Sequence, residues 1–450
     1  MTTPTTRPPK KDGVPQGGRG GPTDPSHDEK LRRGIIDTEI SRPMAAVLVS
    51  AFLIFIYAIP VTQAVLEKKD GQDILIADLF RHAPTRAQLK QLEDDLEQAS
   101  YPKAWTQPRL QEALTRWGRV GNKKSVVGVG AGADGRGHWL YYKPGITYVG
   151  GPAFLEPRIL DGRARAALDA GEPPLAADPR LAILAFHEAL AKRGIALVVF
   201  PVPDKAMLQP LELHGRGDAR QIQPVPLNPD FERLLRDLRA AGVVVFDATP
   251  PALGPGEPPR YLEQDTHWTP GWMEAVAGDL AHYLRETRIL PREPNPAAPK
   301  LTLVELPVSR VGDIVDMLKL TDGQTVFPAR TVTIHQVHDA AGAEWEPDAK
   351  GDVLLLGDSF SNIYSLEQMG WGSAAGFGPQ LAFALGRGVD VIAQNDSGAF
   401  ATRQALAREL AGDPQRLAGK RVVIWEFASR ELAVGDWKAV DWTAASAETP

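Results

Sequence analysis

Residues 353–361 read Val-Leu-Leu-Leu-Gly-Asp-Ser-Phe-Ser, an apolar run that ends abruptly in turn-forming residues. Four consecutive apolar residues are typical of a strand that is buried on both faces, as in the centre of a parallel sheet. Gly357 permits a sharp turn, and Asp358 can cap a helix that follows. Ser359 would then lie at the carboxyl edge of the sheet, where α/β enzymes hold their catalytic groups. Taken alone, the pattern fits a helix cap after a core strand better than it fits a nucleophile.

Residues 261–270 read Tyr-Leu-Glu-Gln-Asp-Thr-His-Trp-Thr-Pro and supply the partners that a nucleophilic serine needs. A serine reacts well when a histidine takes its proton and a carboxylate orients that histidine. Asp265 and His267 are two residues apart, so an extended backbone would direct both side chains to one side. His267 alone would be interpreted as an ordinary loop histidine. Together, the two stretches predict a triad of Ser359, His267 and Asp265.

The composition excludes several classes of protein. With 450 residues the chain can bury a large core, and its length indicates about two or three structural units. The net charge of −6 and the lack of a long basic block argue against nucleic acid as a partner. The chain contains no cysteine, which excludes disulfides, thiol catalysis and cysteine-ligated metal ions.

The N-terminal part of the sequence predicts a tail followed by a membrane span. Residues 1–42 are mostly polar and predict a disordered cytoplasmic tail. Residues 43–66 carry no charge and are long enough to cross a bilayer as a transmembrane anchor. A core helix of this length would show a polar face, and a cleaved signal peptide would show a better small-residue site. Basic residues before the span slightly outnumber those after it, which favours an inner-membrane, single-pass protein with its catalytic domain in the periplasm.

Beyond the span, the pattern changes from helical to alternating. Residues 67–124 predict a helical stalk or insertion that Pro84, Pro102 and Pro108 break into pieces. Residues 125–436 predict one domain in which amphipathic helices alternate with buried strands, and residues 437–450 are a tail. This alternation is typical of a mainly parallel sheet with helices on both faces. The predicted strands of that sheet are residues 195–201, 243–246, 353–356, 389–393 and 422–427.

Polar residues follow most of these strands, and the carboxyl ends of parallel strands meet at one edge of a sheet. One crevice at that edge could therefore collect Asp204, Lys205, Asp247, Ser359, Asn395 and Glu426.

Other polar motifs predict no cofactor. The glycine string at 130–135 matches a dinucleotide-binding pattern, but a strand follows it, so we interpret it as a hairpin. Asp313 and Asp316 fit a solvated face better than a cation site. His187 lacks the second histidine of a zinc-protease helix, so we expect no catalytic metal.

The pairing of Asp-Thr-His-Trp-Thr at 265–269 with Gly-Asp-Ser-Phe-Ser at 357–361 resembles the alginate O-acetyltransferase family of the AlgJ/AlgX type. The resemblance covers residues 125–435 approximately and includes Pro-Val-Pro-Asp-Lys at 201–205. Ordinary SGNH esterases carry the Gly-Asp-Ser block first, so the reversed order here is similar to the permuted acetyltransferase branch. The implied fold class is α/β, an SGNH-hydrolase-like (flavodoxin-like), mainly parallel sheet with helices on both faces, plus the single N-terminal transmembrane helix.

The resemblance implies Ser359 as nucleophile, His267 as base and Asp265 as the residue that orients the base. It also implies transfer of acetyl groups to hydroxyls of an exopolysaccharide, alginate-like or another polymer, outside the cytoplasmic membrane. A multispanning membrane-bound O-acyltransferase would supply the acetyl groups. The single anchor, without a carbohydrate-binding module after residue 435, looks more like AlgJ than AlgX.

The sequence does not decide which groups stabilise the oxyanion, and it leaves two alternative functions open. The Ser359 backbone N–H and the Asn395 side chain are candidate oxyanion donors, although a plain turn residue is an equally good interpretation of Asn395. A carbohydrate acetylesterase would use the same triad with water as acceptor. A non-catalytic scaffold of an exopolysaccharide export complex would keep the fold without needing the triad. The paired motifs favour the transferase.

Overall fold

The computed structural model describes residues 41–74, 77, 85–128, 138–214, 224–254, 257–291, 300–395 and 398–442. The chain divides into two compact units, Met1–Lys103 and Ala104–Pro450. Three predictions lie wholly or mostly outside the described residues: the disordered tail at 1–42, the glycine string at 130–135 and the C-terminal tail at 437–450.

The first unit contains one long apolar helix. Helix α2 spans Arg42–Lys69 and contains the whole of the predicted 43–66 span. Its most apolar 18-residue window has a mean hydropathy of 2.5, and none of that window is buried in the structure. Among the described residues it is the one helix long and apolar enough to cross a bilayer. Near its end, Gln63 Nε2 donates to Ala99 O at 2.8 Å, at the end of α3 (Arg86–Ala99).

Of the three predicted proline breaks, the one at Pro108 is wrong, whereas α3 ends at Ala99 and a new helix begins beside Pro102. Helix α4 spans Tyr101–Gly118 and contains both Pro102 and Pro108. Pro102 is the second residue of the helix, where a backbone N–H has no partner within the helix in any case. Pro108 lies inside the helix and removes one backbone hydrogen bond without ending it. The third proline, Pro84, lies outside the described residues.

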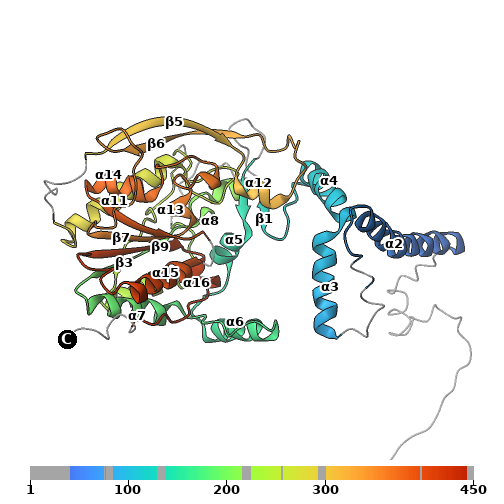
Figure 1. The fold of residues 1–450 in the computed structure, drawn as a ribbon, viewed down its shortest axis with the longest axis horizontal. Helices are drawn as coiled ribbons and strands as arrows, with labels where there is room; N and C mark the ends of the chain where they lie inside the picture. Colours follow the sequence, from blue (N-terminus) through green and yellow to red (C-terminus); the bar gives the residue numbers. More distant parts are fainter. Residues whose placement is uncertain are drawn as a thin grey trace, which may run out of the picture. The chain divides into compact units, whose positions relative to one another are not determined.

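A five-stranded parallel sheet forms the centre of the second unit (Figure 1). The strands lie in the order β4-β3-β9-β7-β8. If the strands are numbered 1 to 5 in the sequence β7, β8, β9, β3, β4 and the sheet is read from its β8 edge, the order is 2-1-3-4-5. That is the doubly wound flavodoxin-like order, entered at a different strand. The strands are β3 (Ala196–Val202), β4 (Val244–Val245), β7 (Val353–Gly357), β8 (Val389–Ala393) and β9 (Val422–Ala428).

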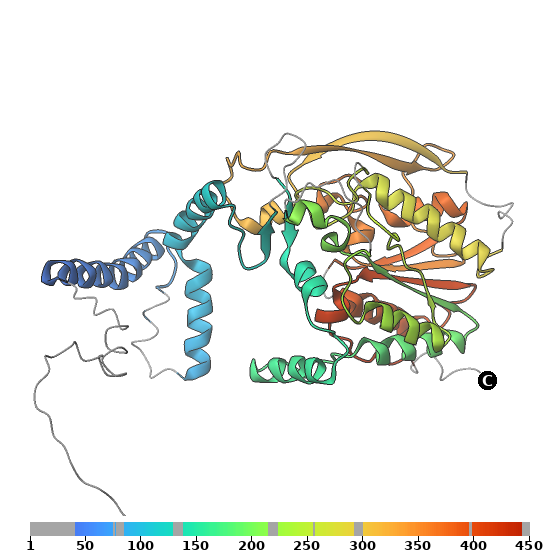
Figure 2. The ribbon, with the colours of Figure 1, turned by 180° about the vertical axis from the view of Figure 1, so that it is seen from behind.

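Helices cover both faces of this sheet, as predicted (Figures 1 and 2). One face carries α11 (Pro270–Glu286) and α14 (Phe377–Leu385). The opposite face carries α7 (Pro179–Ala191) and α15 (Gly398–Gly412). Strand β7 lies between them with all of its residues buried, and burial of each leucine there contributes about 1.5–3 kcal/mol.

The region between residues 288 and 350 adds a two-stranded antiparallel ribbon outside α11 and α14 (Figure 1). It consists of β5 (Thr302–Arg310) and β6 (Arg330–His338), with α12 (Asp313–Leu318) between them in the chain. A second antiparallel pair joins β1 (Ser125–Val127) to β2 (Leu140–Tyr142), so the strands on both sides of the glycine string pair as the hairpin interpretation requires. The shorter helical elements are α5 (Lys143–Gly150), α6 (Pro157–Asp169), α8 (Lys205–Leu208), α9 (Pro210–His214), α10 (Phe231–Ala240), α13 (Ser359–Asn362), η2 (Glu367–Met369) and α16 (Glu431–Val434).

Candidate active site

Ser359 begins α13 directly after the central strand β7. Asp358 holds this turn, because its Oδ1 accepts the Phe360 N–H at 2.8 Å and its Oδ2 accepts the Ala428 N–H at 2.8 Å. Strands β7 and β9 are the neighbours at which the doubly wound order reverses. Ser359 therefore lies at the carboxyl edge of the sheet, at its topological switch point, where ligands bind in folds of this kind.

Glu426 supports the same turn from β9. Its Oε2 accepts the Asp358 N–H at 3.1 Å and the Ser361 hydroxyl at 2.5 Å. A Cβ on Gly357 would lie 2.6 Å from the Ser361 Cβ, so only glycine fits at this point without a shift. Burial and the neighbouring Asp358 carboxylate raise the pKa of Glu426 well above its usual value. A protonated carboxyl fits a position beside a second acid better than a charged one does.

His267 and Asp265 meet Ser359 in a continuous relay. His267 Nε2 lies 2.8 Å from Ser359 Oγ, and His267 Nδ1 lies 2.6 Å from Asp265 Oδ1. The histidine and the serine are 92 residues apart in the chain. Asp265 and His267 are almost completely buried, at 1% and 3% exposure. Since Nδ1 donates to the carboxylate, Nε2 is left to accept the serine proton.

The backbone that carries Asp265 and His267 is a turn and not the extended segment that we predicted. We call residues 261–268 the Asp–His segment. Tyr261 and Trp268 close it in an antiparallel bridge, and Leu262 N donates to His267 O at 3.1 Å. Within it, Asp265 Oδ1 also accepts the His267 N–H at 3.1 Å. This local hydrogen bond, rather than strand geometry, brings the two side chains together.

The charges at the site polarise the relay. Burial alone would lower the pKa of His267, but the carboxylates of Asp265, Asp313 and Asp358 hold that pKa above its usual value. Burial would raise the pKa of Asp265, but its hydrogen bond to His267, the charge of His267 and two backbone N–H groups hold that pKa well below its usual range. Asp265 therefore stays ionised and His267 is a stronger base than a free imidazole.

The sequence pattern missed two partners of Asp265. Its Oδ2 accepts the Asp313 backbone N–H at 3.0 Å and the Trp371 Nε1–H at 3.0 Å. The prediction of a solvated face is therefore wrong for Asp313, whose side chain is 30% exposed and turns toward the site. It holds for Asp316, which is 57% exposed and pairs with Arg310. Trp371 itself is only 2% exposed, and no local sequence signal links either residue to Asp265.

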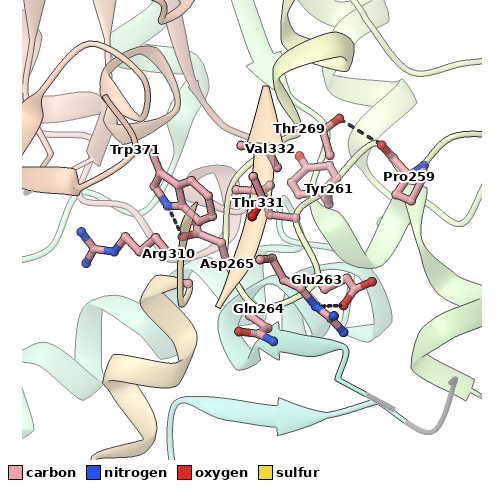
Figure 3. Close-up of a pocket in the computed structure, with 13 residues that line it drawn as sticks. Pro259, Tyr261, Glu263, Gln264, Asp265, Thr269, Arg310, Thr331, Val332 and Trp371 are labelled. Atoms are coloured by element: carbon pink, nitrogen blue, oxygen red, sulfur yellow. Dashed lines mark hydrogen bonds and ion pairs between the residues drawn. The ribbon is translucent and has the colours of Figure 1, made fainter. Parts of the chain in front are cut away.

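A cavity of about 170 Å³ lies beside the Asp–His segment (Figure 3). Residues of the antiparallel ribbon form one wall of it, and Arg330 pairs with Glu263 at 2.9 Å there. Asp265 lines the cavity, whereas His267 and Ser359 are not among its lining residues. The cavity therefore adjoins the acid of the relay and not the serine hydroxyl. Its walls are Pro259, Tyr261, Leu262, Glu263, Gln264, Asp265, Thr269, Arg310, Gly312, Arg330, Thr331, Val332 and Trp371.

Asn395 lies at the same edge of the sheet, two residues after β8. Its Oδ1 accepts a hydrogen bond from Asn362 Nδ2, on α13, at 2.7 Å. This contact leaves the Asn395 amide N–H₂ group available to a ligand. Within the described part of the chain, Asn395 makes no hydrogen bond to Ser359, and nothing accepts the Ser359 backbone N–H.

The other strand-end residues have separate roles. Lys205 is buried beneath the Asp–His segment, and Asp204 pairs with Arg430 at 3.3 Å. Asp247 only closes a local turn by accepting the Thr249 N–H at 2.9 Å.

Asp265, His267 and Asp313 place potential metal-ligating atoms within 4.8 Å of one another. Protein groups already engage most of these atoms: four donors reach the Asp265 carboxylate, and both ring nitrogens of His267 have partners. A metal ion would have to displace these hydrogen bonds, so the residues fit a proton relay better than a metal centre. The absence of a catalytic metal stays a prediction.

A doubly wound parallel sheet with this serine at its switch point defines an SGNH-hydrolase-like α/β protein. Residues 163–429 match the family described as SGNH hydrolase-like domain, acetyltransferase AlgX, and the chain belongs to this family. The matched range contains Ser359, His267, Asp265 and Asn395.

Related proteins are found in bacteria. The chain is 28% identical over 267 residues to a probable alginate O-acetylase AlgJ of Azotobacter vinelandii. The aligned region covers 57% of this chain and 63% of that protein. It is 26% identical over 309 residues to a probable alginate O-acetylase AlgJ of Pseudomonas fluorescens, over 67% of this chain and 68% of the relative. The chain thus spans less than two thirds of the length of the Azotobacter relative.

Two solved structures align with this chain over part of its length. The O-acetyltransferase domain of Pseudomonas putida AlgJ is 20% identical, with a TM-score of 0.47, over 71% of this chain and 99% of that one. Pseudomonas aeruginosa AlgX is 17% identical, with a TM-score of 0.48, over 71% of this chain and 66% of that one.

Proposed function

We propose that the protein is an O-acetyltransferase that carries an acetyl group on Ser359 and delivers it to a hydroxyl of an exopolysaccharide. The observation that supports this most directly is the relay of 2.6 Å and 2.8 Å contacts from Asp265 through His267 to Ser359. Both distances are short enough for proton transfer. Membership of the family supplies the acetyl chemistry.

The proposed reaction has two steps. In the first, His267 Nε2 takes the hydroxyl proton while Ser359 Oγ attacks the carbonyl carbon of an acetyl ester. The leaving alcohol then receives that proton from His267, and acetyl-Ser359 remains. In the second step, His267 takes the proton of a sugar hydroxyl, whose oxygen attacks the acetyl-enzyme. Ser359 recovers its proton from His267, and an O-acetylated sugar is released.

The negative charge on the carbonyl oxygen needs donors in both steps. We assign this role to the Ser359 backbone N–H and to the Asn395 side-chain amide. The Asn362 contact supports Asn395, because it fixes the amide so that its N–H₂ group faces away from Asn362. Loss of one such donor typically costs about 2.7–4 kcal/mol of barrier.

The descriptions of the relatives support a proposal for the acceptor, and the acetyl donor is a further part of the proposal. Those of Azotobacter vinelandii and Pseudomonas fluorescens are described as probable alginate O-acetylases, so we propose alginate or a similar exopolysaccharide as acceptor. A multispanning membrane-bound O-acyltransferase would supply the acetyl groups. We further propose that α2 is a single-pass anchor in the inner membrane, with the catalytic unit in the periplasm. Its length, its hydropathy and the basic residues before it support this location.

The full chain tests the function directly. Purified protein is given a soluble acetyl ester, with and without a uronic-acid oligosaccharide, and both released acetate and acetylated sugar are measured. We expect the sugar to gain acetyl groups, and Ser359→Ala to lose at least about 1,000-fold of the transfer rate. Ser309→Ala, which alters an exposed serine on β5, is the matched control and should keep the rate.

Two results would contradict the proposal. A folded Ser359→Ala protein with normal transfer would exclude the serine mechanism. Acetate release without any acetylated sugar would identify an acetylesterase instead.

A further inference from the structure

The Asp–His segment is held by two charged groups that the triad itself does not include. One is the ammonium of Lys205, which follows β3, and the other is the carboxylate of Asp313, the first residue of α12. We call these two residues the clamp.

The ammonium of Lys205 gathers the backbone carbonyl groups of the segment. Its Nζ lies 2.6 Å from Leu262 O, 3.1 Å from Glu263 O and 3.0 Å from Asp265 O. A fourth carbonyl, of Leu140 on β2, lies at 2.6 Å and ties the segment to that strand. Lys205 is only 3% exposed. An ammonium has three N–H groups and no acceptor, so Lys205 can serve three of these four carbonyl oxygens at a time.

The carboxylate of Asp313 accepts hydrogen bonds from Thr266 of the same segment. Its Oδ1 accepts the Thr266 N–H at 2.7 Å and the Thr266 hydroxyl at 3.1 Å. Its own backbone N–H donates to Asp265 Oδ2 at 3.0 Å. Gly312 makes this approach possible, because a Cβ there would lie 2.6 Å from the Asp265 backbone nitrogen. Carbonyl groups of the segment therefore accept hydrogen bonds from Lys205, and one of its backbone N–H groups donates to Asp313.

Asp313 also adds a charge that the base can sense. Its Oδ2 lies 3.9 Å from His267 Nδ1. The ionisable groups that act on His267 are Asp265 on its own segment, Asp313 on α12 and Asp358 before α13. Lys205 in turn interacts with the charges of Asp265 and Asp313. A second anion near Nδ1 favours the imidazolium that forms when His267 takes a proton.

We propose that Lys205 and Asp313 are positioning residues for the acyl transfer, which hold the Asp–His segment in the conformation that aims His267 at Ser359. Asp313 has the additional effect of stabilising protonated His267. This inference rests on the proposed function, since it assigns a role around the same triad. Burial lowers the pKa of Lys205 to about 7, and the Asp265 and Asp313 carboxylates oppose that fall. Burial and the Asp265 charge raise the pKa of Asp313 to about 7, whereas protonated His267 and the hydrogen bond from Thr266 lower it, so the Asp313 anion is favoured when His267 carries a proton.

The test compares four variants of the full chain by kcat, KM and pH profile in the acetyl-transfer assay. Asp313→Asn keeps the shape and an acceptor for Thr266 but removes the charge. Asp316→Asn, on the same helix but 57% exposed, is its matched control. Lys205→Met removes the buried ammonium. Its control is Lys420→Met, because Lys420 is also buried, donates to Ala349 O and Gly351 O at 2.8 and 2.7 Å, and pairs with Asp390 away from the triad.

We expect Asp313→Asn to reduce kcat about tenfold, with the acidic limb of the pH profile about half a unit to one unit lower. The limb falls because a less stabilised imidazolium loses its proton at lower pH, and a merely structural role would not move it. Lys205→Met should reduce kcat at least about tenfold more than Lys420→Met does. Both lysine variants should show a similar loss of Tm, since each loses one buried ammonium.

The outcomes separate the clamp from the function on which it rests. If Ser359→Ala is inactive while Asp313→Asn matches Asp316→Asn in kcat and in the acidic limb, the clamp is wrong and the triad stands. A folded Lys205→Met protein as active as Lys420→Met has the same meaning. If Lys205→Met does not fold, Asp313→Asn alone decides. If Ser359→Ala keeps its activity, the proposed function itself fails.

Discussion

Asp265 accepts four hydrogen bonds at the centre of the site. Four N–H groups reach its two oxygens, from the backbone and ring of His267, the backbone of Asp313 and the indole of Trp371. A buried carboxylate with this many donors keeps its charge and has one fixed orientation. Its work is therefore to fix the tautomer of His267 and to raise the basicity of the ring.

Replacement of Asp265 by asparagine tests this assignment. We expect kcat to fall about 10³–10⁴-fold, since an amide can no longer select the tautomer with hydrogen on Nδ1. In the unmodified protein the rate should rise with pH as His267 loses its proton. Because the pKa of His267 is raised, that rise should be centred above about pH 6.5. In Asp265→Asn the remaining activity should also rise with pH, but the midpoint of that rise should lie at a lower pH than in the unmodified protein. The measurement is kcat/KM for a soluble acetyl ester between about pH 5 and 9; a limb centred below pH 6 in the unmodified protein would contradict the assignment.

The sequence predicted the triad but not its surroundings, for a physical reason. Ser359, His267 and Asp265 carry their chemistry in side-chain type and local spacing, which can be read along the chain. Trp371 and Asp313 reach Asp265 only through folding, from 106 and 48 residues away. A buried tryptophan and a surface-type aspartate look ordinary in sequence, and only packing gives them their partners.

At the scale of elements, the turn between β7 and α13 depends on the absence of a side chain at Gly357. A methyl group there would meet the Ser361 side chain, whose hydroxyl bonds to Glu426. We expect Gly357→Ala to shift the turn, lower Tm by several degrees and reduce transfer at least about tenfold. Gly278→Ala in α11 is the matched control, since a Cβ there would meet nothing within 4 Å. That control should be neutral or stabilising by about 0.5–1 kcal/mol. Equal activity and equal melting in thermal unfolding of the two variants would contradict this view of the turn.

The elements themselves were predictable where hydrophobic periodicity is strong. Strand β8 has the predicted bounds, and β7 and β9 extend one residue beyond them. Prediction was wrong where a polar side chain or a proline competes with the local pattern. The Asp–His segment is a turn because Asp265 bonds to the His267 backbone, and α4 continues through Pro108. Rules based on residue spacing take account neither of a side chain that bonds to the backbone nor of a helix that continues through a proline.

At the scale of the whole molecule, the reversed order of the two motifs leaves the site unchanged. The strand that carries Ser359 comes after β3 and β4 in this chain, yet the sheet keeps the spatial order of the doubly wound fold. The predicted alternation of helices and strands required a parallel sheet but left its strand order undetermined. Pairing between β3 and β9, across 226 residues from Ala196 to Val422, is decided by packing alone. A permuted chain can therefore place its serine at the same switch point, because that point depends on which strands are neighbours.

The proposed anchor makes a prediction for the molecule as a whole. Removal of residues 1–69 deletes α2 and leaves the second unit, which has its own sheet and core, intact. We expect the truncated protein to stay in the supernatant after membranes are sedimented, whereas the full chain sediments with them. Its kcat for a soluble acetyl ester should be within about twofold of the full chain, because the triad and its supports all come from residues after 138. Acetylation of polymer in cells should fall strongly, since the enzyme would no longer stay beside a donor in the membrane. A truncated protein that still sediments with membranes would show that α2 is not the anchor.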